Sequence, residues 1–287
     1  MYYGFIMLSV LMFGGCFFVK DIYRRKRNAS ETLMTYESMF IGSIVGLLIL
    51  FILNGFKIEF TWFTFIIVLI TTLNNLAFTY CSFKALKHIN LSIFSLFTML
   101  GGMLLPFLQG ILFYNEEFTI GKLICVILIV ISLLLTIKNS DEKKGYIYYI
   151  GIFILNGMSG IISKIFLEAP FVKTSVEGYS ILLAIVSVIV SSVMLLFLSK
   201  FKKEKTQIFN FKTSSLCMLN GALDKIANYL LVFALMYVDS SIQYPLVTGG
   251  VIIVSTINSY FLGNKASIKE IISVVIAFIG LLILFVF

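Results

Sequence analysis

Histidine, paired cysteines and charge are scarce in this sequence of 287 residues. Its single histidine, His88, excludes a histidine-based metal site or catalytic triad. The four cysteines lie inside apolar runs without CxxC spacing, so neither a disulfide nor a metal site is predicted. They are Cys16, Cys81, Cys125 and Cys217. The nucleotide-binding pattern GxxxxGK followed by Ser or Thr is also absent, as is HExxH. No cofactor is therefore expected, and both an ATP-driven pump and an enzyme are disfavoured.

Charged residues make up only 13% of the chain, whereas hydrophobic residues make up 60% and the mean hydropathy is +1.03. This composition excludes an ordinary soluble domain and indicates an integral membrane protein. The net charge of +8 does not indicate a nucleic-acid partner, because the basic residues lie in short segments between apolar runs. The first apolar run, 2–19, lacks a basic leading region and a small-residue cleavage site, so no cleavable signal is expected.

The apolar runs are long enough to cross a bilayer, which takes about 20 residues per helix. They predict an all-α membrane protein with ten transmembrane helices and no soluble domain. The predicted helices are 2–19, 32–54, 61–84, 91–113, 120–137, 146–167, 175–199, 211–235, 241–261 and 267–287.

Lysine and arginine are distributed unevenly over the predicted connections. Seventeen fall on one side of the membrane and four on the other, while Lys225 lies inside a span. Because positive loops stay in the cytoplasm, this distribution predicts a plasma-membrane protein with both termini outside.

The predicted helix 211–235 carries a polar stripe. Asn220, Asp224 and Asn228 lie at i, i+4 and i+8 and share one helical face. A charge near the bilayer centre costs roughly 2.5–3.5 kcal/mol, so such residues usually face a watery or protein-lined cavity. The alternative is a hydrogen-bonded seam between packed helices. Residues at i and i+1 do not face each other, so we expect Lys225 to find a partner on another helix.

A displacement of 149 residues places the third predicted span over the eighth. Thr71, Asn75, Thr79 and Tyr80 then fall on Asn220, Asp224, Asn228 and Tyr229. The match predicts two five-helix halves, 1–140 and 141–287. Because five is odd, the second half must be inverted in the membrane, which is typical of secondary transporters.

Several short motifs carry a resemblance to a known family. They are Gly15-Cys-Phe-Phe-Val-Lys20 with its echo Gly160-Ile-Ile-Ser-Lys164, Phe83-Lys-Ala-Leu86, Phe233-Ala-Leu-Met-Tyr-Val-Asp-Ser-Ser241 and the hinge Asn115-Glu-Glu-Phe-Thr119. Together they resemble the drug/metabolite transporter superfamily in its ten-helix EamA-type branch. The counterpart of the hinge, Gly263–Ser267, has Asn264 where that family usually has Glu. Family members commonly keep both termini in the cytoplasm, whereas the charges of this chain predict the opposite.

This resemblance implies a secondary carrier that moves a small metabolite or drug-like solute by alternating access. Proton coupling follows if Asp224 exchanges a proton for solute. Two other interpretations stay open: a polytopic subunit that does not transport, and a membrane-embedded enzyme. The expected partners are a solute and the lipid bilayer, with the chain a monomer or homodimer.

Candidate residues fall into two groups. The expected substrate-binding residues are Asp224, Lys225, Asn228, Asn220, Asn75, Asn74, Thr71, Thr79, Tyr80 and Tyr229, the tyrosines offering stacking or cation–π contacts. The expected gating or helix-end residues are Lys20, Lys164, Gly101, Gly102, Pro106, Pro245, Gly249 and Gly250. The two lysines could instead only snorkel to the interface, and the glycines and prolines could only serve helix packing. Glu37 and Glu177 are explained by the dipole at a helix N-terminus.

Overall fold

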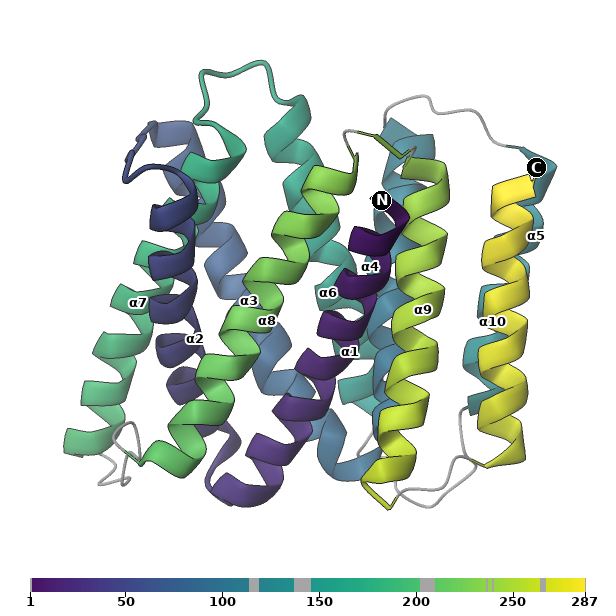
Figure 1. Ribbon diagram of the computed structural model, residues 1–287, viewed down its shortest axis with the longest axis horizontal. Coiled ribbons are helices and arrows are strands. Elements are labelled where there is room, and N and C mark those ends of the chain that lie inside the picture. The colour runs from purple at the N-terminus through teal and green to yellow at the C-terminus, as the bar shows by residue number, and fades with distance from the viewer. Residues whose placement is uncertain are drawn as a thin grey trace.

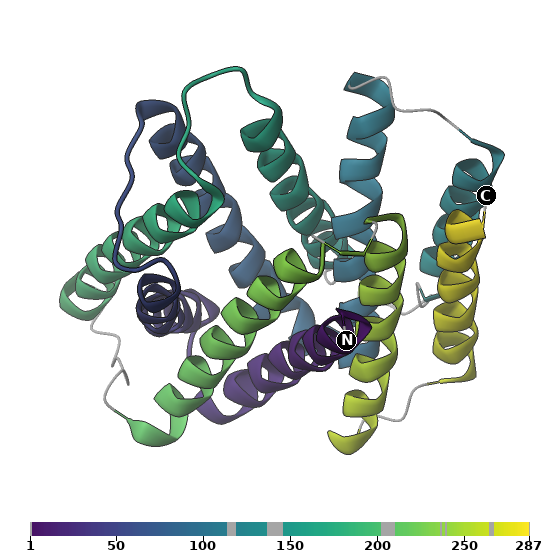
Figure 2. The same ribbon diagram turned by 45° about the horizontal axis from the view of Figure 1, so that its top comes forward.

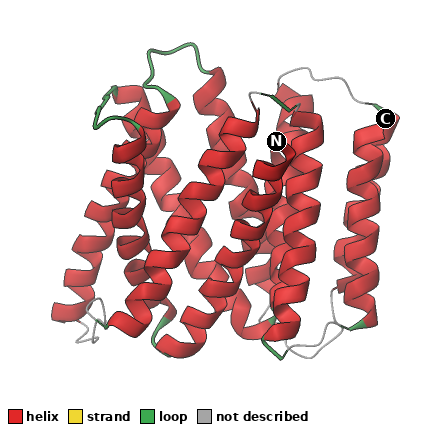
Figure 3. Ribbon diagram, in the orientation of Figure 1, coloured by secondary structure: helices red, strands yellow, loops and turns green. Residues whose placement is uncertain are grey.

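The computed structural model describes residues 2–113, 119–136, 146–201, 210–235, 237–238, 240–263 and 267–286. Within them the regular structure is entirely helical (Figure 3), so the predicted all-α membrane fold is confirmed. The helices are α1 (Tyr2–Arg27), α2 (Glu31–Leu53), α3 (Trp62–His88), α4 (Leu91–Phe113), α5 (Ile120–Thr136), α6 (Tyr146–Glu168), α7 (Val176–Phe201), α8 (Phe211–Leu235), α9 (Ser240–Phe261) and α10 (Ile268–Val286).

Helix α1 is longer than predicted, because it continues past its apolar run to Arg27. Asp21 supports the additional turns by pairing with Arg24 at i+3 and Arg25 at i+4. The helix ends where Asn28 takes a positive φ of 43°, and Ser30 then caps α2 by accepting a hydrogen bond from the backbone N–H of Leu33.

Six of the described helices are long and apolar enough to span a membrane: α1, α2, α3, α4, α6 over Ile147–Glu168, and α7. Two shorter apolar segments, Leu123–Ser132 and Leu246–Phe261, lie in α5 and α9. The chain is therefore a multi-pass membrane protein. Ten crossings stay a prediction.

The helices of the two predicted halves interlock instead of forming separate bundles. Helix α1 packs against α8 and α9, and α6 packs in the same way against α3 and α4. In Figures 1 and 2, α2 and α7 lie at one end of the molecule, whereas α5 and α10 pair at the other. The pairings of α1 with α8 and α9 correspond to those of α6 with α3 and α4 when the helix numbers are exchanged by five, as an internal two-fold axis would require. The inverted repeat itself stays a prediction.

Close helix crossings explain several of the predicted gating residues. A Cβ atom on Gly157 of α6 would lie 2.6 Å from the carbonyl oxygen of Gly101 on α4. Pro106 lies against Gly160 at the same crossing, and a Cβ atom on Gly102 would meet Asn156. These residues therefore bring two backbones together, as small residues do in membrane helices.

Three more of the predicted gating residues, Pro245, Gly249 and Gly250, lie in α9. A Cβ atom on Gly250 would lie 2.8 Å from Cγ1 of Val10, so Gly250 packs tightly against α1. Gly249 is buried. Pro245 falls within the bounds of α9, and its side chain lies outside the described part of the structure.

Candidate functional site

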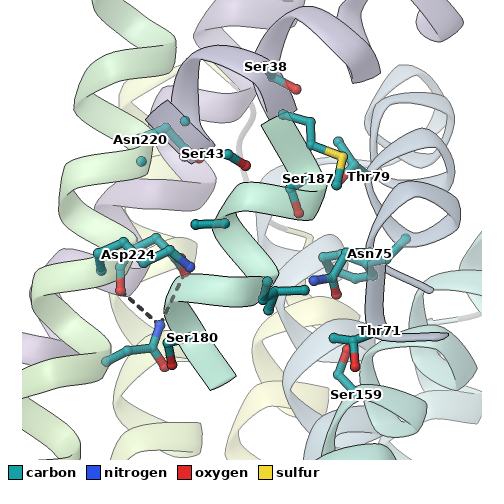
Figure 4. Close-up of a pocket in the computed structure, with 18 of the residues that line it drawn as sticks. Ser38, Ser43, Thr71, Asn75, Thr79, Ser159, Ser180, Ser187, Asn220 and Asp224 are labelled. Carbon is teal, nitrogen blue, oxygen red and sulfur yellow. Dashed lines mark hydrogen bonds and ion pairs between the residues drawn. The ribbon is translucent and has the colours of Figure 1, made fainter. Parts of the chain in front are cut away.

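A cavity of about 700 Å³ lies between α1, α2, α3, α6, α7 and α8. Most of the predicted substrate-binding residues line it: Thr71, Asn75, Thr79, Asn220, Asp224, Lys225, Asn228 and Tyr229. Figure 4 shows Asp224 on α8 and Asn75 on α3 facing the cavity from opposite sides. The two polar stripes, far apart in the sequence, therefore meet around one space.

Asp224 is held by its neighbours on α8. Its Oδ2 lies 3.1 Å from Nζ of Lys225, and its Oδ1 accepts a hydrogen bond of 3.3 Å from the amide of Asn228. The expectation that Lys225 pairs with another helix is thus wrong. Gly46 of α2 explains the difference, because a Cβ atom there would lie 3.1 Å from Cγ and Cε of Lys225. The missing side chain leaves room for the lysine stem to bend back toward Asp224.

Asn220 lines the cavity and also anchors α8 to α1. Its amide donates a hydrogen bond of 2.7 Å to the carbonyl oxygen of Cys16. One residue later, a Cβ atom on Gly221 would lie 2.7 Å from Cα of Gly42 on α2. The alternative of a helix-packing seam therefore describes this end of the stripe.

The two neighbouring asparagines of α3 lie differently. Asn75 lines the cavity, and no hydrogen bond joins its side chain to the described residues. The amide of Asn74 instead donates to the carbonyl oxygen of Leu155 at 2.9 Å and to Oγ of Ser159 at 2.8 Å. Asn74 is therefore used in packing α3 against α6 and lies outside the cavity lining, contrary to expectation.

Of the two aromatic candidates, only one lines the cavity. Tyr229 lines the cavity, whereas Tyr80 lies outside its lining, with its ring centroid 5.8 Å from Nζ of Lys84. Thr71 lines the cavity and shares a hydrogen bond of 2.8 Å with the hydroxyl of Tyr179 on α7.

Lys20 and Lys164 were expected at helix ends. Because α1 continues to Arg27, Lys20 lies inside the helix and lines the cavity. Its Nζ lies 5.1 Å from the ring centroid of Phe78 and 5.9 Å from that of Phe83. Lys164 is half-buried on α6, four residues before the helix ends, and is not part of the cavity lining.

Sequence reasoning missed a set of small hydroxyl side chains in the lining. They are Ser38 and Ser43 of α2, Ser159 and Ser163 of α6, and Ser180 and Ser187 of α7. All of them except Ser163 are labelled in Figure 4. A signal existed in α7, because Ser180 and Ser187 are seven residues apart and so share one face of an otherwise apolar helix.

The cavity is sealed where α1 ends. Tyr23, Phe83 and Cys217 close this end with exposures of 3%, 0% and 3%. Behind them, the carboxylate of Glu37 accepts hydrogen bonds from the hydroxyl of Tyr23 at 2.9 Å and from Nε of Arg27 at 2.8 Å. Glu37 is 2% exposed and joins α2 to α1, so it does more than complement the dipole of its helix.

The opposite end, where α7 begins and α8 ends, is accessible. Glu177 and Asn228 are exposed there, and Tyr229 is 48% exposed. In Figure 1 this is the upper end of the molecule, where both termini also lie. The basic residues at the ends of α1 and α3 lie at the lower, sealed end.

Residues 1–138 match the model of the EamA-like transporter family. Over these residues the chain is similar to the EamA branch of the drug/metabolite transporter superfamily. No curated protein matches this EamA-like protein. The predicted resemblance to this superfamily is thus confirmed, and it suggests a membrane transporter.

The cavity of this EamA-like protein offers polar contacts and few charges. Its described lining includes two acids, Asp224 and Glu177, and two cations, Lys20 and Lys225. Within the described ranges, no group of three or more histidine, cysteine or acidic side chains is placed to hold a metal ion. The arrangement suits binding of a polar solute through hydroxyl and amide groups, with charge at a few defined points.

Proposed function

We propose that this EamA-like protein is a secondary carrier that moves a small metabolite or drug-like solute by alternating access. The observation that carries the proposal is the cavity of about 700 Å³, closed at one end and accessible at the other. A polar space of this size inside apolar helices suits a solute that must leave water partway across a membrane.

The pairing of helices supports the alternating mechanism. The proposed halves are 1–140 and 141–287, and the contacts of α1 with α8 and α9 have a counterpart in those of α6 with α3 and α4. The family match ends at residue 138, next to the proposed boundary. In the opposite state, the end near Tyr23 opens and the end near Tyr229 closes. One chain encloses the whole cavity, so a monomer suffices for transport and a homodimer would contain two such pathways.

Asp224 is the proposed coupling residue. A carboxylate in the cavity can bind either a proton or the polar part of a solute, and Lys225 forms an ion pair with it. Competition between proton and solute for the same oxygens would couple their movements in opposite directions.

The proposed location is the plasma membrane, with the sealed end toward the cytoplasm. The excess of lysine and arginine at that end supports this orientation. Both termini and the accessible end of the cavity then face outward.

Reconstitution of the purified chain in liposomes tests the proposal. Counterflow of radiolabelled amino acids, nucleosides, amines and sugars should reveal at least one solute that enters faster than into protein-free liposomes. Ser187→Phe, which fills the cavity, should abolish this entry, whereas Val193→Phe on the outer face of α7 should not. If the pure protein carries none of these solutes, the proposal fails in favour of a non-transporting subunit or an enzyme.

A further inference from the structure

Lys20 is the cation of the described cavity lining that has no ion pair. The other lining cation, Lys225, pairs with Asp224. No described carboxylate lies within 4.0 Å of Nζ of Lys20, and no hydrogen bond joins this nitrogen to a described group.

The acids nearest to Lys20 along the chain and across the cavity are already engaged. Asp21 pairs with Arg24 and Arg25 on the turns that follow. Glu37 pairs with Arg27 at the sealed end, and Asp224 with Lys225 on α8. The lysine therefore lacks a counter-charge because every acid around it has another cation closer by.

The position of Lys20 also excludes simple snorkelling. It lies seven residues before the end of α1, and its ammonium group turns inward over Phe78 and near Phe83. Aromatic faces attract a cation, yet they accept none of its N–H donors as an oxygen would. An ammonium group kept in a membrane cavity without an oxygen partner is ready to bind an anion.

We propose that Lys20 binds the anionic group, a carboxylate or phosphate, of the carried solute. This inference rests on the proposed transport function and names the chemical class of its solute. The apolar part next to the anionic group lies against Phe78 and Phe83. The solute then enters with its negative end toward the sealed end, while Asp224 remains free to bind a proton or a cationic group.

Three probes of similar shape test the anion site on the purified full chain: 3-phenylpropionate, phenyl phosphate and the neutral 3-phenylpropionamide. Thermal unfolding in detergent reports binding. A matching anion at about ten times its Kd should raise the Tm by about 3 °C. The amide should bind about tenfold or more weakly, because it lacks the charge-assisted hydrogen bond to the ammonium group. The anion that raises the Tm more identifies whether the site prefers a carboxylate or a phosphate.

Variants assign the effect to Lys20. Lys20→Met should abolish the preference for anion over amide, and it should fold well because it removes an unpaired charge. Lys20→Arg should keep the preference. Lys164→Met is the matched control, because Lys164 is the predicted repeat counterpart outside the cavity lining.

The proposal is overturned if neither anion stabilises the protein, if the amide stabilises it equally, or if Lys20→Met retains the anion preference. Its failure is distinguishable from failure of the transport proposal. Counterflow of only cationic or neutral solutes would support the transport proposal and contradict the anion site. Anion binding without counterflow of any solute would support the anion site and contradict the transport proposal.

Discussion

The ammonium nitrogen of Lys225 lies 3.1 Å from Oδ2 of Asp224, its immediate neighbour in the sequence. Helix α8 therefore brings an acid and its counter-charge into the cavity together. The side chains of Lys225 and Asp224 are 32% and 41% exposed, so removing one partner does not leave a fully buried charge. A proton or a solute that binds Asp224 can replace Lys225 as its partner, so this pair is the expected centre of the coupling reaction.

Replacing Asp224 with Asn keeps the shape and removes the charge. We expect insertion and folding to be nearly unchanged and transport driven by a pH gradient to be abolished, because the coupling group no longer binds a proton. Exchange of solute for solute should survive. Flux into proteoliposomes with a pH gradient measures the driven transport, and flux without a gradient measures the exchange of solute for solute. Glu168→Gln, an exposed acid at the end of α6, is the control. Gradient-driven flux of wild-type size in Asp224→Asn would falsify the coupling hypothesis.

Replacing Lys225 with Met removes the positive charge next to Asp224. The loss leaves Asp224 without the partner that replaces a bound proton or solute when it leaves. We therefore expect the initial rate of gradient-driven transport to fall several-fold, measured in proteoliposomes. Lys164→Met serves as the control because it lies outside the cavity lining. An unchanged rate would show that the pair takes no part in the coupling reaction.

Replacing Glu37 with Gln should loosen the sealed end. Removing one partner of a buried ion pair costs about 3–5 kcal/mol, which disfavours the closed arrangement around Arg27. Cys217 lies in the same buried cluster and reports the opening. In a variant whose only cysteine is Cys217, labelling by a membrane-impermeant maleimide from the sealed side should become several-fold faster.

The control for this labelling is Glu168→Gln, which leaves the sealed end intact. Equal labelling rates in the protein with Glu37 and in the Glu37→Gln variant would mean that the ion pair does not hold the sealed end closed.

Replacing Gly221 with Ala should destabilise the α2–α8 crossing. The added Cβ atom would lie 2.7 Å from Cα of Gly42, and a backbone atom cannot yield as a side chain does. We expect a loss of about 1–3 kcal/mol, seen as a lower Tm in detergent. Gly4→Ala is the matched control, since no heavy atom lies within 4 Å of its added Cβ. Similar Tm values for both variants would rule out the tight crossing.

A reporter fused after the last residue tests the orientation. Because the sequence predicts 17 of the 22 lysines and arginines on the side opposite the termini, a C-terminal alkaline phosphatase should be exported and active. A C-terminal green fluorescent protein, which fluoresces in the cytoplasm, should be dark. The opposite pair of signals would restore the orientation usual in the family.

The sequence by itself determined where the helices lie and which faces are polar. Apolar runs of membrane length must satisfy their backbone hydrogen bonds internally, so they become helices wherever they occur. The spacing of Asn220 and Asp224 places both on one face for the same geometric reason. Both residues accordingly line the cavity, as predicted.

Only the tertiary structure decided how individual side chains in these helices are used. Asn74 and Asn75 are adjacent, yet the rotation of α3 against α6 sends one into packing and the other into the cavity. Glu37 meets Arg27 only because α1 extends beyond its apolar run as far as Arg27. Helical periodicity defines directions around one axis, whereas the partner found in each direction depends on which helix packs there, and this is a property of the whole bundle.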